Sequence, residues 1–492
     1  MGDEPEHPFA RRRAGVLLHP TSLPGAGALG AAARAFIELI ANAGFSVWQT
    51  LPLGPVGGDG SPYQTHSVFA GHTGLLAWDE PEVGAWVEHG GGAGRGLGGG
   101  LGDRLHAAAL GFAAIADEPA RADHARFVGE AADWLEDYAR FAVYKGHFAE
   151  RPWWEWPQAV RDRDPAALAA LDEQLSDALE AERFGQFLFH RQWQAIRAHA
   201  HAHGVLLFGD MPIFVALDSM EVWSNPDAFA LDADKRPLAV AGVPPDYFSE
   251  TGQRWGNPLY DWRAMAADNF AWWVRRLGVA LSQFDLVRID HFRGFQAYWE
   301  IPAENDTAAG GQWVEAPGEA LFTRLCEAFG ERLPVVAEDL GVITPEVEAL
   351  RDRFRLPGMK ILQFAFDGYS DNPYLPHSHV PLAVVYTGTH DNDTTLGWYQ
   401  SLEASERQRV LDYHGYPQEA MPRPLLRSAL ASVAKLAMIP FQDLLGLDGS
   451  ARMNRPGTVE GNWAWAFQWS DLPEHFASDY RHLLEIYGRL VR

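Results

Sequence analysis

The chain has 492 residues, of which 40 are Lys or Arg and 65 are Asp or Glu, so its formal net charge is −25. A protein this acidic repels nucleic-acid phosphates and anionic membrane surfaces, and we expect neither as a partner. Hydrophobic residues make up 47% of the chain, which excludes wholesale disorder. No apolar stretch approaches the roughly 18 residues of a membrane span. The single cysteine, Cys326, excludes an internal disulfide and a cysteine-based zinc site. These features predict a soluble, cytoplasmic, globular protein.

Short, largely apolar runs recur along the chain and are typical of parallel strands buried on both faces. There are eight, at residues 14–19, 46–53, 204–212, 286–291, 334–340, 359–366, 384–391 and 437–444. Helical patterns lie between them at residues 31–43, 270–281, 319–329, 345–354 and 405–414. Eight strands alternating with helices predict a (β/α)₈ TIM barrel, and we interpret residues 1–492 as one such unit.

Two gaps between predicted strands are much longer than a βα unit requires. The first predicts a mostly helical insertion after strand two, residues 60–200, which includes a glycine-rich stretch at 90–102 that we interpret as a flexible linker. The second predicts a loop-rich, irregular insertion after strand three, residues 213–275. Both insertions follow strands at the C-terminal face, where barrel enzymes have their active sites.

Acidic residues stand at the ends of several predicted strands. They are Asp210, Asp290, Glu338, Asp339 and Asp391, the last preceded by His390. Acids that converge on one barrel mouth suit either a divalent cation or the cleavage of glycosidic bonds. A lone acid at a strand end is more often a helix cap or half of an ion pair, and we prefer that interpretation for Asp339. For Asp210 both interpretations stay open.

The pleat of the strands separates the roles of two acids. Arg288 and Asp290 share a face, so the arginine favours the ionised form of Asp290. An ionised acid suits a nucleophile or an electrostatic stabiliser, whereas a metal ligand would not be expected beside a fixed cation. Glu338 shares its face with Val336 and Leu340 and has no cation nearby in sequence. Burial should therefore raise the pKa of Glu338, as a general acid requires.

Three motifs resemble the strand ends of α-amylase-type barrels: RIDHF at 288–292, AEDLG at 337–341 and HDN at 390–392. Longer strings are similar to the amylomaltase family, the bacterial 4-α-glucanotransferases. They are SPYQ at 61–64, GDMPI at 209–213, GVPPDYFSETGQRWGNPLY at 242–260 and RMNRPG at 452–457. The motifs extend from about residue 15 to residue 465, so the resemblance covers nearly the whole chain.

The resemblance implies transfer of α-1,4-glucan segments from a maltooligosaccharide donor to the 4-OH of glucose or another maltooligosaccharide, with retained configuration and without cofactor or metal. It implies that Asp290 is the nucleophile, Glu338 the acid/base and Asp391 the third acid. The substrate-binding residues that we assign are Ser61, Tyr63, Asp210, Asp246, Phe248, Gln253, Trp255, Arg288, His390 and Asn454. The proline-rich loop that contains residues 244–255 is expected to form a lid that excludes water.

Three alternatives remain. An α-1,4-glucan hydrolase of the α-amylase type would have the same acids, but the lid favours transfer. A metal-dependent barrel would use Asp210, Glu338 and Asp391 as ligands, against which Arg288 argues. A non-catalytic glucan-binding barrel would normally have lost one of the three acids.

Overall fold

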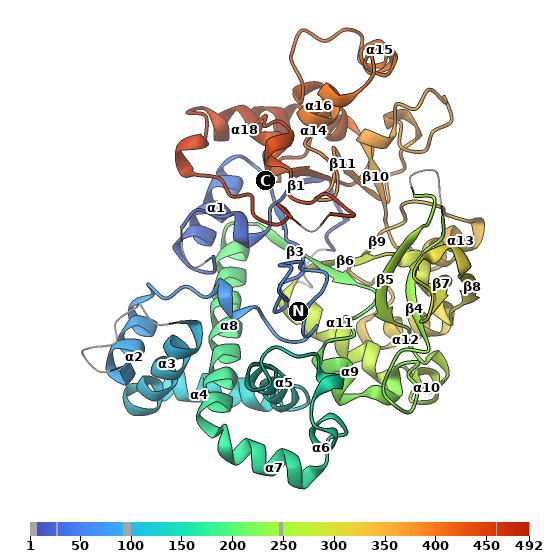
Figure 1. Ribbon diagram of the computed structural model, residues 1–492. Helices are drawn as coiled ribbons and strands as arrows, with labels where there is room; N and C mark the ends of the chain where they lie inside the picture. The colour runs from blue at the N-terminus through green and yellow to red at the C-terminus, as the bar shows by residue number, and fades with distance from the viewer. Residues whose placement is uncertain (1–6, 26–27, 92–99, 246–248, 459, 492) are drawn as a thin grey trace.

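The computed structural model describes residues 7–25, 28–91, 100–245, 249–458 and 460–491. Its central strands are β1 (Arg13–Leu17), β2 (Val47–Gln49), β3 (Leu206–Pro212), β6 (Leu286–Asp290), β9 (Val335–Ala337), β10 (Gly358–Ile361), β11 (Ala383–Tyr386) and β12 (Leu436–Pro440). They pair in parallel in the order β10-β11-β12-β1-β2-β3-β6-β9 (Figure 1). Between the two ends of this sheet, the N–H of Ala337 donates to the carbonyl of Pro357 at 2.9 Å. The predicted (β/α)₈ barrel is confirmed, and each predicted run overlaps one of its strands.

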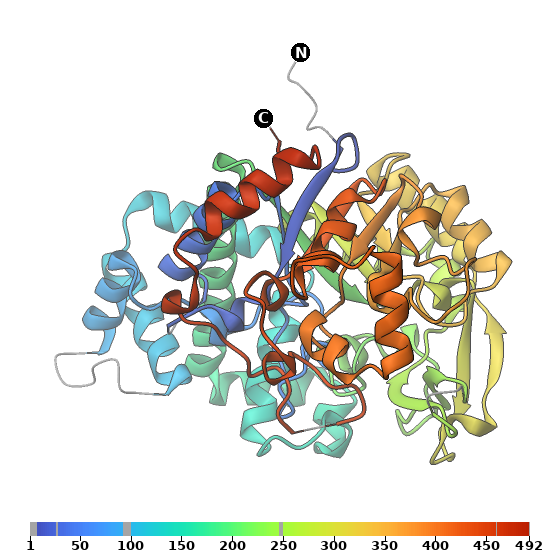
Figure 2. The same cartoon turned by 90° about the horizontal axis from the view of Figure 1, so that it is seen from above.

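Helices surround this barrel. Between β1 and β2 lies α1 (Ala31–Asn42). Between β2 and β3 lie α2 (Pro81–Gly91), α3 (Leu101–Ile115), α4 (Glu118–Glu130), α5 (Leu135–His147), α6 (Gln158–Arg161), α7 (Pro165–Gln174) and α8 (Ser176–Ala202), which occupy one side of the molecule in both views (Figures 1 and 2). The later helices are α9 (Met220–Ser224), α10 (Trp262–Ala267), α11 (Ala271–Gln283), α12 (Gly318–Phe329), α13 (Pro345–Arg353), α14 (Thr395–Ser401), α15 (Ala404–Tyr413), α16 (Arg423–Ala431), α17 (Phe441–Leu444) and α18 (Phe476–Ile486). Among the described residues, no helix combines the length and apolar character needed to cross a bilayer.

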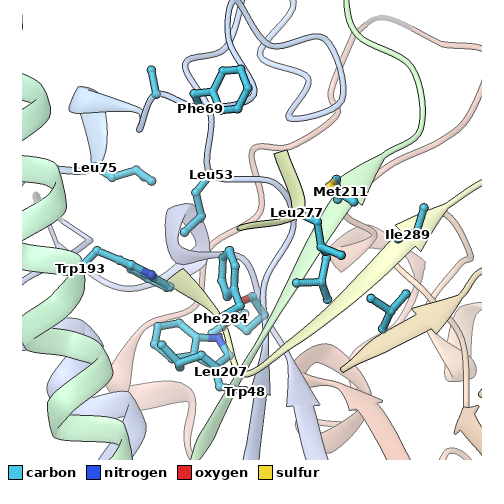
Figure 3. Close-up of a cluster of buried hydrophobic side chains, with 14 of the residues drawn as sticks. Trp48, Leu53, Phe69, Leu75, Trp193, Leu207, Met211, Leu277, Phe284 and Ile289 are labelled. Atoms are coloured by element: carbon cyan, nitrogen blue, oxygen red, sulfur yellow. Dashed lines mark hydrogen bonds between the residues drawn. The ribbon is translucent and has the colours of Figure 1, made fainter. Parts of the chain in front are cut away.

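The strand pleat divides the buried side chains into an inner and an outer layer. One cluster, which includes Phe208, Leu286 and Val336, comes mainly from the strands and fills the barrel interior. The neighbouring residues Val287 and Ile289 belong instead to the large cluster between the sheet and the helices. Figure 3 shows part of that outer layer, where side chains of α8 and α11 meet the strands. This alternation confirms the predicted pleat of β6.

A second sheet lies beside the barrel. Its strands are β4 (Ala239–Val243), β5 (Gln253–Pro258), β7 (Ala297–Pro302) and β8 (Gln312–Glu315), antiparallel in the order β5-β4-β7-β8. The irregular conformation expected for residues 213–275 is therefore wrong for β4 and β5. Their glycines and prolines obscured the strand pattern, and β4 pairs with β7, which comes from after β6.

Glycines near residue 90 have a packing role. Gly90 lies in α2 and Gly102 in α3, whereas residues 92–99 lie outside the described part of the chain. A Cβ on Gly90 would lie 1.9 Å from the carbonyl oxygen of Ala107, and one on Gly111 would lie 1.8 Å from that of Trp86. Gly90 and Gly111 therefore allow α2 and α3 to approach closely. Because the two ends of the glycine-rich stretch belong to these helices, its interpretation as a flexible linker is wrong at both ends.

Candidate active site

The carboxyl ends of the barrel strands open into a cleft of about 1020 Å³. Its lining combines barrel residues, including Asp290, Glu338 and Asp391, with Gln253 and Trp255 from β5 of the second sheet. The cleft lies at the C-terminal face because the strands of a parallel barrel all end on the same side. The cleft therefore brings the three predicted acids together.

Arg288 connects two acids of the site. Its Nη1 donates to both carboxylate oxygens of Asp210, at 2.8 and 2.7 Å, and its Nη2 donates to Oδ1 of Asp290 at 2.6 Å. The pairing of β3 with β6 places Asp210 opposite Arg288, and the pleat places Asp290 on the same face. Arg288 and Asp210 are buried, whereas the Asp290 side chain keeps 31% of its exposure and reaches the cleft. The predicted pairing of Arg288 with Asp290 is confirmed.

Tyr63 completes this network from the loop after β2. Its hydroxyl donates to Oδ2 of Asp210 at 2.7 Å, and its ring stacks on His390 with centroids 5.2 Å apart and planes 15° apart. Burial, reinforced by the charge of Asp210, raises the pKa of Tyr63 well above its usual range, so the phenol stays protonated. Burial likewise raises the pKa of Asp210, although Arg288 opposes the effect. The backbone N–H of Tyr63 donates in turn to Oγ of Ser61 at 3.3 Å.

Glu338 directly follows β9 and is 9% exposed. Burial, and then the charge of Asp290, raise its pKa to about 8. Arg288 opposes this shift, as do two backbone donors: the N–H of His291 to Oε2 at 2.6 Å and that of Leu340 to Oε1 at 3.0 Å. His291 presents its N–H from a left-handed backbone conformation with φ 54°. The predicted upward shift of the Glu338 pKa is confirmed, and the side chain is mostly protonated at neutral pH.

Asp391 and His390 do not end their strand as predicted. Strand β11 ends at Tyr386, and both residues lie in the loop that follows. The loop after β12 contacts this segment: Nδ2 of Asn454 donates to Oδ1 of Asp391 at 2.6 Å, and Nη2 of Arg452 donates to its carbonyl at 2.6 Å. Nε2 of His390 lies 3.3 Å from the same Oδ1. Asp391 is therefore held in position by contacts with the loop after β12 and not by strand β11.

The predicted lid lies partly outside the described residues. Asp246 and Phe248 belong to the segment 246–248, of which the structure gives no description. Gln253 and Trp255 begin β5, and Oε1 of Gln253 accepts from Nε1 of Trp255 at 3.1 Å. The Trp255 ring meets the ring of His291 edge-on, with centroids 4.8 Å apart.

Asp339 has the structural role that we preferred for it. Its Oδ1 accepts from the backbone N–H of Met359 at 2.7 Å, and its Oδ2 pairs with Arg351 of α13. It is buried and belongs to a different network from Glu338.

Sequence reasoning missed an aromatic wall of the cleft. Trp313, Phe364, Trp398 and Trp463 all line it. Trp313 stands on β8, 40% exposed, with the guanidinium of Arg293 at 3.7 Å from its ring centroid. The alternating QWVE pattern of β8 was the available signal, but without its partner strand it could not be assigned.

A barrel whose mouth holds an arginine-paired carboxylate, a protonated glutamate and aromatic walls has the site of an enzyme that acts on glycosidic bonds. Comparison with known proteins identifies the family of enzymes. A family model described as 4-alpha-glucanotransferase matches residues 18–471.

Relatives match over almost the whole chain. The 4-alpha-glucanotransferase of Thermus thermophilus is 50% identical over 485 residues, covering 95% of this chain and 97% of its own. The chloroplastic/amyloplastic enzyme of Solanum tuberosum is 42% identical over 513 residues, covering 98% and 87%. The structure of amylomaltase from Streptococcus agalactiae in complex with acarbose has a TM-score of 0.91 and 35% identity, covering 98% of this chain and 100% of that one. The chain belongs to the 4-alpha-glucanotransferase family, and a hydrolase is not favoured.

Proposed function

We propose that this protein transfers α-1,4-glucan segments from a maltooligosaccharide donor to the 4-OH of glucose or another maltooligosaccharide, by double displacement with retention. The observation that carries the proposal is the contrast between two neighbouring carboxyl groups. Asp290 accepts a hydrogen bond from the buried guanidinium of Arg288, whereas the pKa of Glu338 is raised to about 8. Environments that separate two carboxyls in this way assign one as nucleophile and the other as acid.

In the first step, the Asp290 carboxylate attacks the anomeric carbon of the donor. The glycosidic bond breaks, and Glu338 gives its proton to the leaving oxygen, so that an ester of Asp290 and a shortened glucan result. Arg288 orients the nucleophile through Nη2. Asp391, whose Oδ1 is held by Asn454, accepts hydrogen bonds from hydroxyls of the sugar that reacts.

In the second step, the acceptor 4-OH attacks the same carbon from the face that the leaving group vacated. The Glu338 carboxylate takes the hydroxyl proton, the ester bond breaks and Asp290 is released, so the cycle ends with Glu338 protonated again. Two inversions give net retention. Every proton that moves is held by Glu338, and no cofactor or metal takes part.

Transfer requires that a sugar hydroxyl reaches the ester before water does. We assign this role to the lid. Its residues are Gln253 and Trp255, which the structure describes, and Asp246 and Phe248, which lie outside the described residues. Sugar-binding roles go to Ser61, Tyr63, Asp210, Arg288, His390 and Asn454. The stacking of Tyr63 on His390 supports a rigid platform for a sugar ring.

The same proposal extends to organisation and location. Residues 1–492 form one catalytic unit with insertions at 60–200 and 213–275, and the enzyme works in the cytoplasm. The formal charge of −25 supports the expectation that neither nucleic acid nor a membrane surface is a partner.

Product analysis tests the proposal. The protein is incubated with pure maltotriose and a chelator, and the oligosaccharides are separated with time. Longer oligosaccharides that accumulate together with glucose are the expected result. Glucose and maltose alone would establish a hydrolase, and absence of turnover that metal restores would establish a metal enzyme.

A further inference from the structure

We propose that Glu38, His199 and His203 bind a transition-metal cation of the zinc class on the outside of the barrel. Glu38 lies on α1, and the two histidines lie four positions apart at the C-terminal end of α8, which packs beside α1 (Figure 1). The ligand atoms of the three side chains all lie within 4.8 Å of one another. None of the three is among the described residues that line the substrate cleft.

A backbone contact favours the neutral tautomer of His203 that has its lone pair on Nε2. Its Nδ1 lies 2.9 Å from the carbonyl oxygen of His199. A carbonyl only accepts, so Nδ1 carries the hydrogen and the lone pair is on Nε2. A backbone carbonyl orients metal-binding histidines in the same way.

One nitrogen of His199 faces Glu38 without a hydrogen bond. This Nε2 is shielded from solvent and makes no hydrogen bond within the described chain, and its charged neighbour is Oε1 of Glu38 at 3.2 Å. In a tetrahedral zinc site, bonds of about 2.0 Å place ligand atoms about 3.3 Å apart. Nε2 of His199 and Oε1 of Glu38 already have this separation. A cation between them would satisfy the nitrogen without moving either helix.

The donor set selects the class of cation. Two imidazoles and one carboxylate suit Zn²⁺, Ni²⁺ or Cu²⁺, whereas Mg²⁺ and Ca²⁺ prefer oxygen ligands. Glu38 and His203 are exposed, so solvent ions reach the site, and water fills the fourth position. The metal would join α1, which precedes β2, to α8, which precedes β3, and thereby stabilise the attachment of the helical segment to the barrel.

The same stretch supplies a matched control. His201 lies between the two histidines, but its Nε2 pairs with both carboxylate oxygens of Asp285, at 2.9 Å each. Replacing it removes a histidine from the same turn and leaves the proposed ligands in place.

Calorimetric titration of the full-length, chelator-treated protein with ZnCl₂ tests the proposal. We expect one zinc ion per chain, and affinity weaker by at least about tenfold in His203→Ala and Glu38→Gln, because loss even of an outer partner weakens metal sites by about that much. His201→Ala should bind like the wild type, and MgCl₂ should give no binding heat. Zinc should also raise the melting temperature of the wild type and of His201→Ala, but not of His203→Ala.

Two results would overturn the proposal: no zinc binding by the wild type, or equal zinc affinity in the wild type and both ligand variants. Glu38 is exposed on α1, so Glu38→Gln keeps the fold even where a histidine variant does not.

Discussion

Replacing Glu338 with glutamine should change how the stability of the protein depends on pH. The pKa of Glu338 is about 8 in the folded protein, against an ordinary value of 4.5. Between these values the folded state binds more protons than the unfolded state, so stability falls as pH rises through this window. The penalty is absent below pH 4.5 and fully developed above pH 8. Glutamine does not titrate, so the variant lacks this pH-dependent loss of stability.

The magnitude follows from the two pKa values. At 1.36 kcal/mol per pH unit, a carboxyl shifted from 4.5 to about 8 destabilises the folded protein by roughly 3 kcal/mol at pH 7. Glutamine brings an offset of its own, because both Glu338 oxygens accept backbone N–H groups and the amide nitrogen would face one of them. That offset is the same at every pH. The predicted quantity is therefore the rise of about 3 kcal/mol in the relative stability of the variant between pH 4 and pH 7.

Urea unfolding of both proteins, followed by tryptophan fluorescence at intervals from pH 4 to pH 8, measures this rise. Asp290→Asn serves as the companion variant, because the charge of Asp290 is the second cause of the Glu338 shift. In that background the pKa of Glu338 should be lower, so the effect of glutamine at pH 7 should be smaller. A stability difference between Glu338→Gln and the wild type that stays constant with pH would refute the reasoning.

Three further predictions address rate, substrate length and folding. The kcat/KM for glucan transfer should fall above about pH 8, where Glu338 loses the proton of the first step, and a profile flat to pH 10 would contradict its role as the acid. Trp313→Ala should raise KM for maltoheptaose about five- to tenfold, the value of one aromatic stacking contact. We expect a smaller effect on maltotriose, because Trp313 lies on β8, the edge of the second sheet opposite β5, whose Trp255 contacts His291 next to Asp290. Equal effects on both substrates would count against this wall as the binding site of the more distant sugars. Arg489→Met should lower the free energy of unfolding, measured with urea, by about 3 kcal/mol. The reason is that the buried guanidinium donates hydrogen bonds to backbone carbonyls that include those of Leu430 and Arg13. An unchanged midpoint of unfolding would show that water replaces those hydrogen bonds.

The barrel was predictable because each of its strands is buried on both faces and so has a continuous apolar run of its own. The second sheet was not, because the pairing of β4 with β7 joins segments that flank β6. A strand that is stabilised mainly by a distant partner shows only a weak local pattern. Trp313, on β8, was missed for this reason.

Within the site, the strand pattern alone explained three residues, Arg288, Asp290 and Glu338. Arg288 and Asp290 share a face by the pleat alone, and burial of Glu338 followed from its apolar neighbours. Asp391 was placed on β11, whereas a loop holds it through contacts with Asn454 and Arg452. Contacts between loops of distant strands leave no periodic signal, and only the motif located this residue.

The pairing of β6 with its two neighbouring strands determines the charge pattern of the site. Pairing of β3 with β6 puts Asp210 opposite Arg288, so one guanidinium binds a buried acid with Nη1 and orients Asp290 with Nη2. A slip of one residue in β6 would turn Val287 and Ile289 toward the mouth and bury the arginine against apolar helices. The pairing of β6 with β9 places Ile289 opposite Ala337 and so brings the Asp290 charge beside Glu338, where it helps to keep that acid protonated. The difference between the two carboxyls, on which double displacement depends, is therefore a consequence of how β6 pairs with its two neighbours.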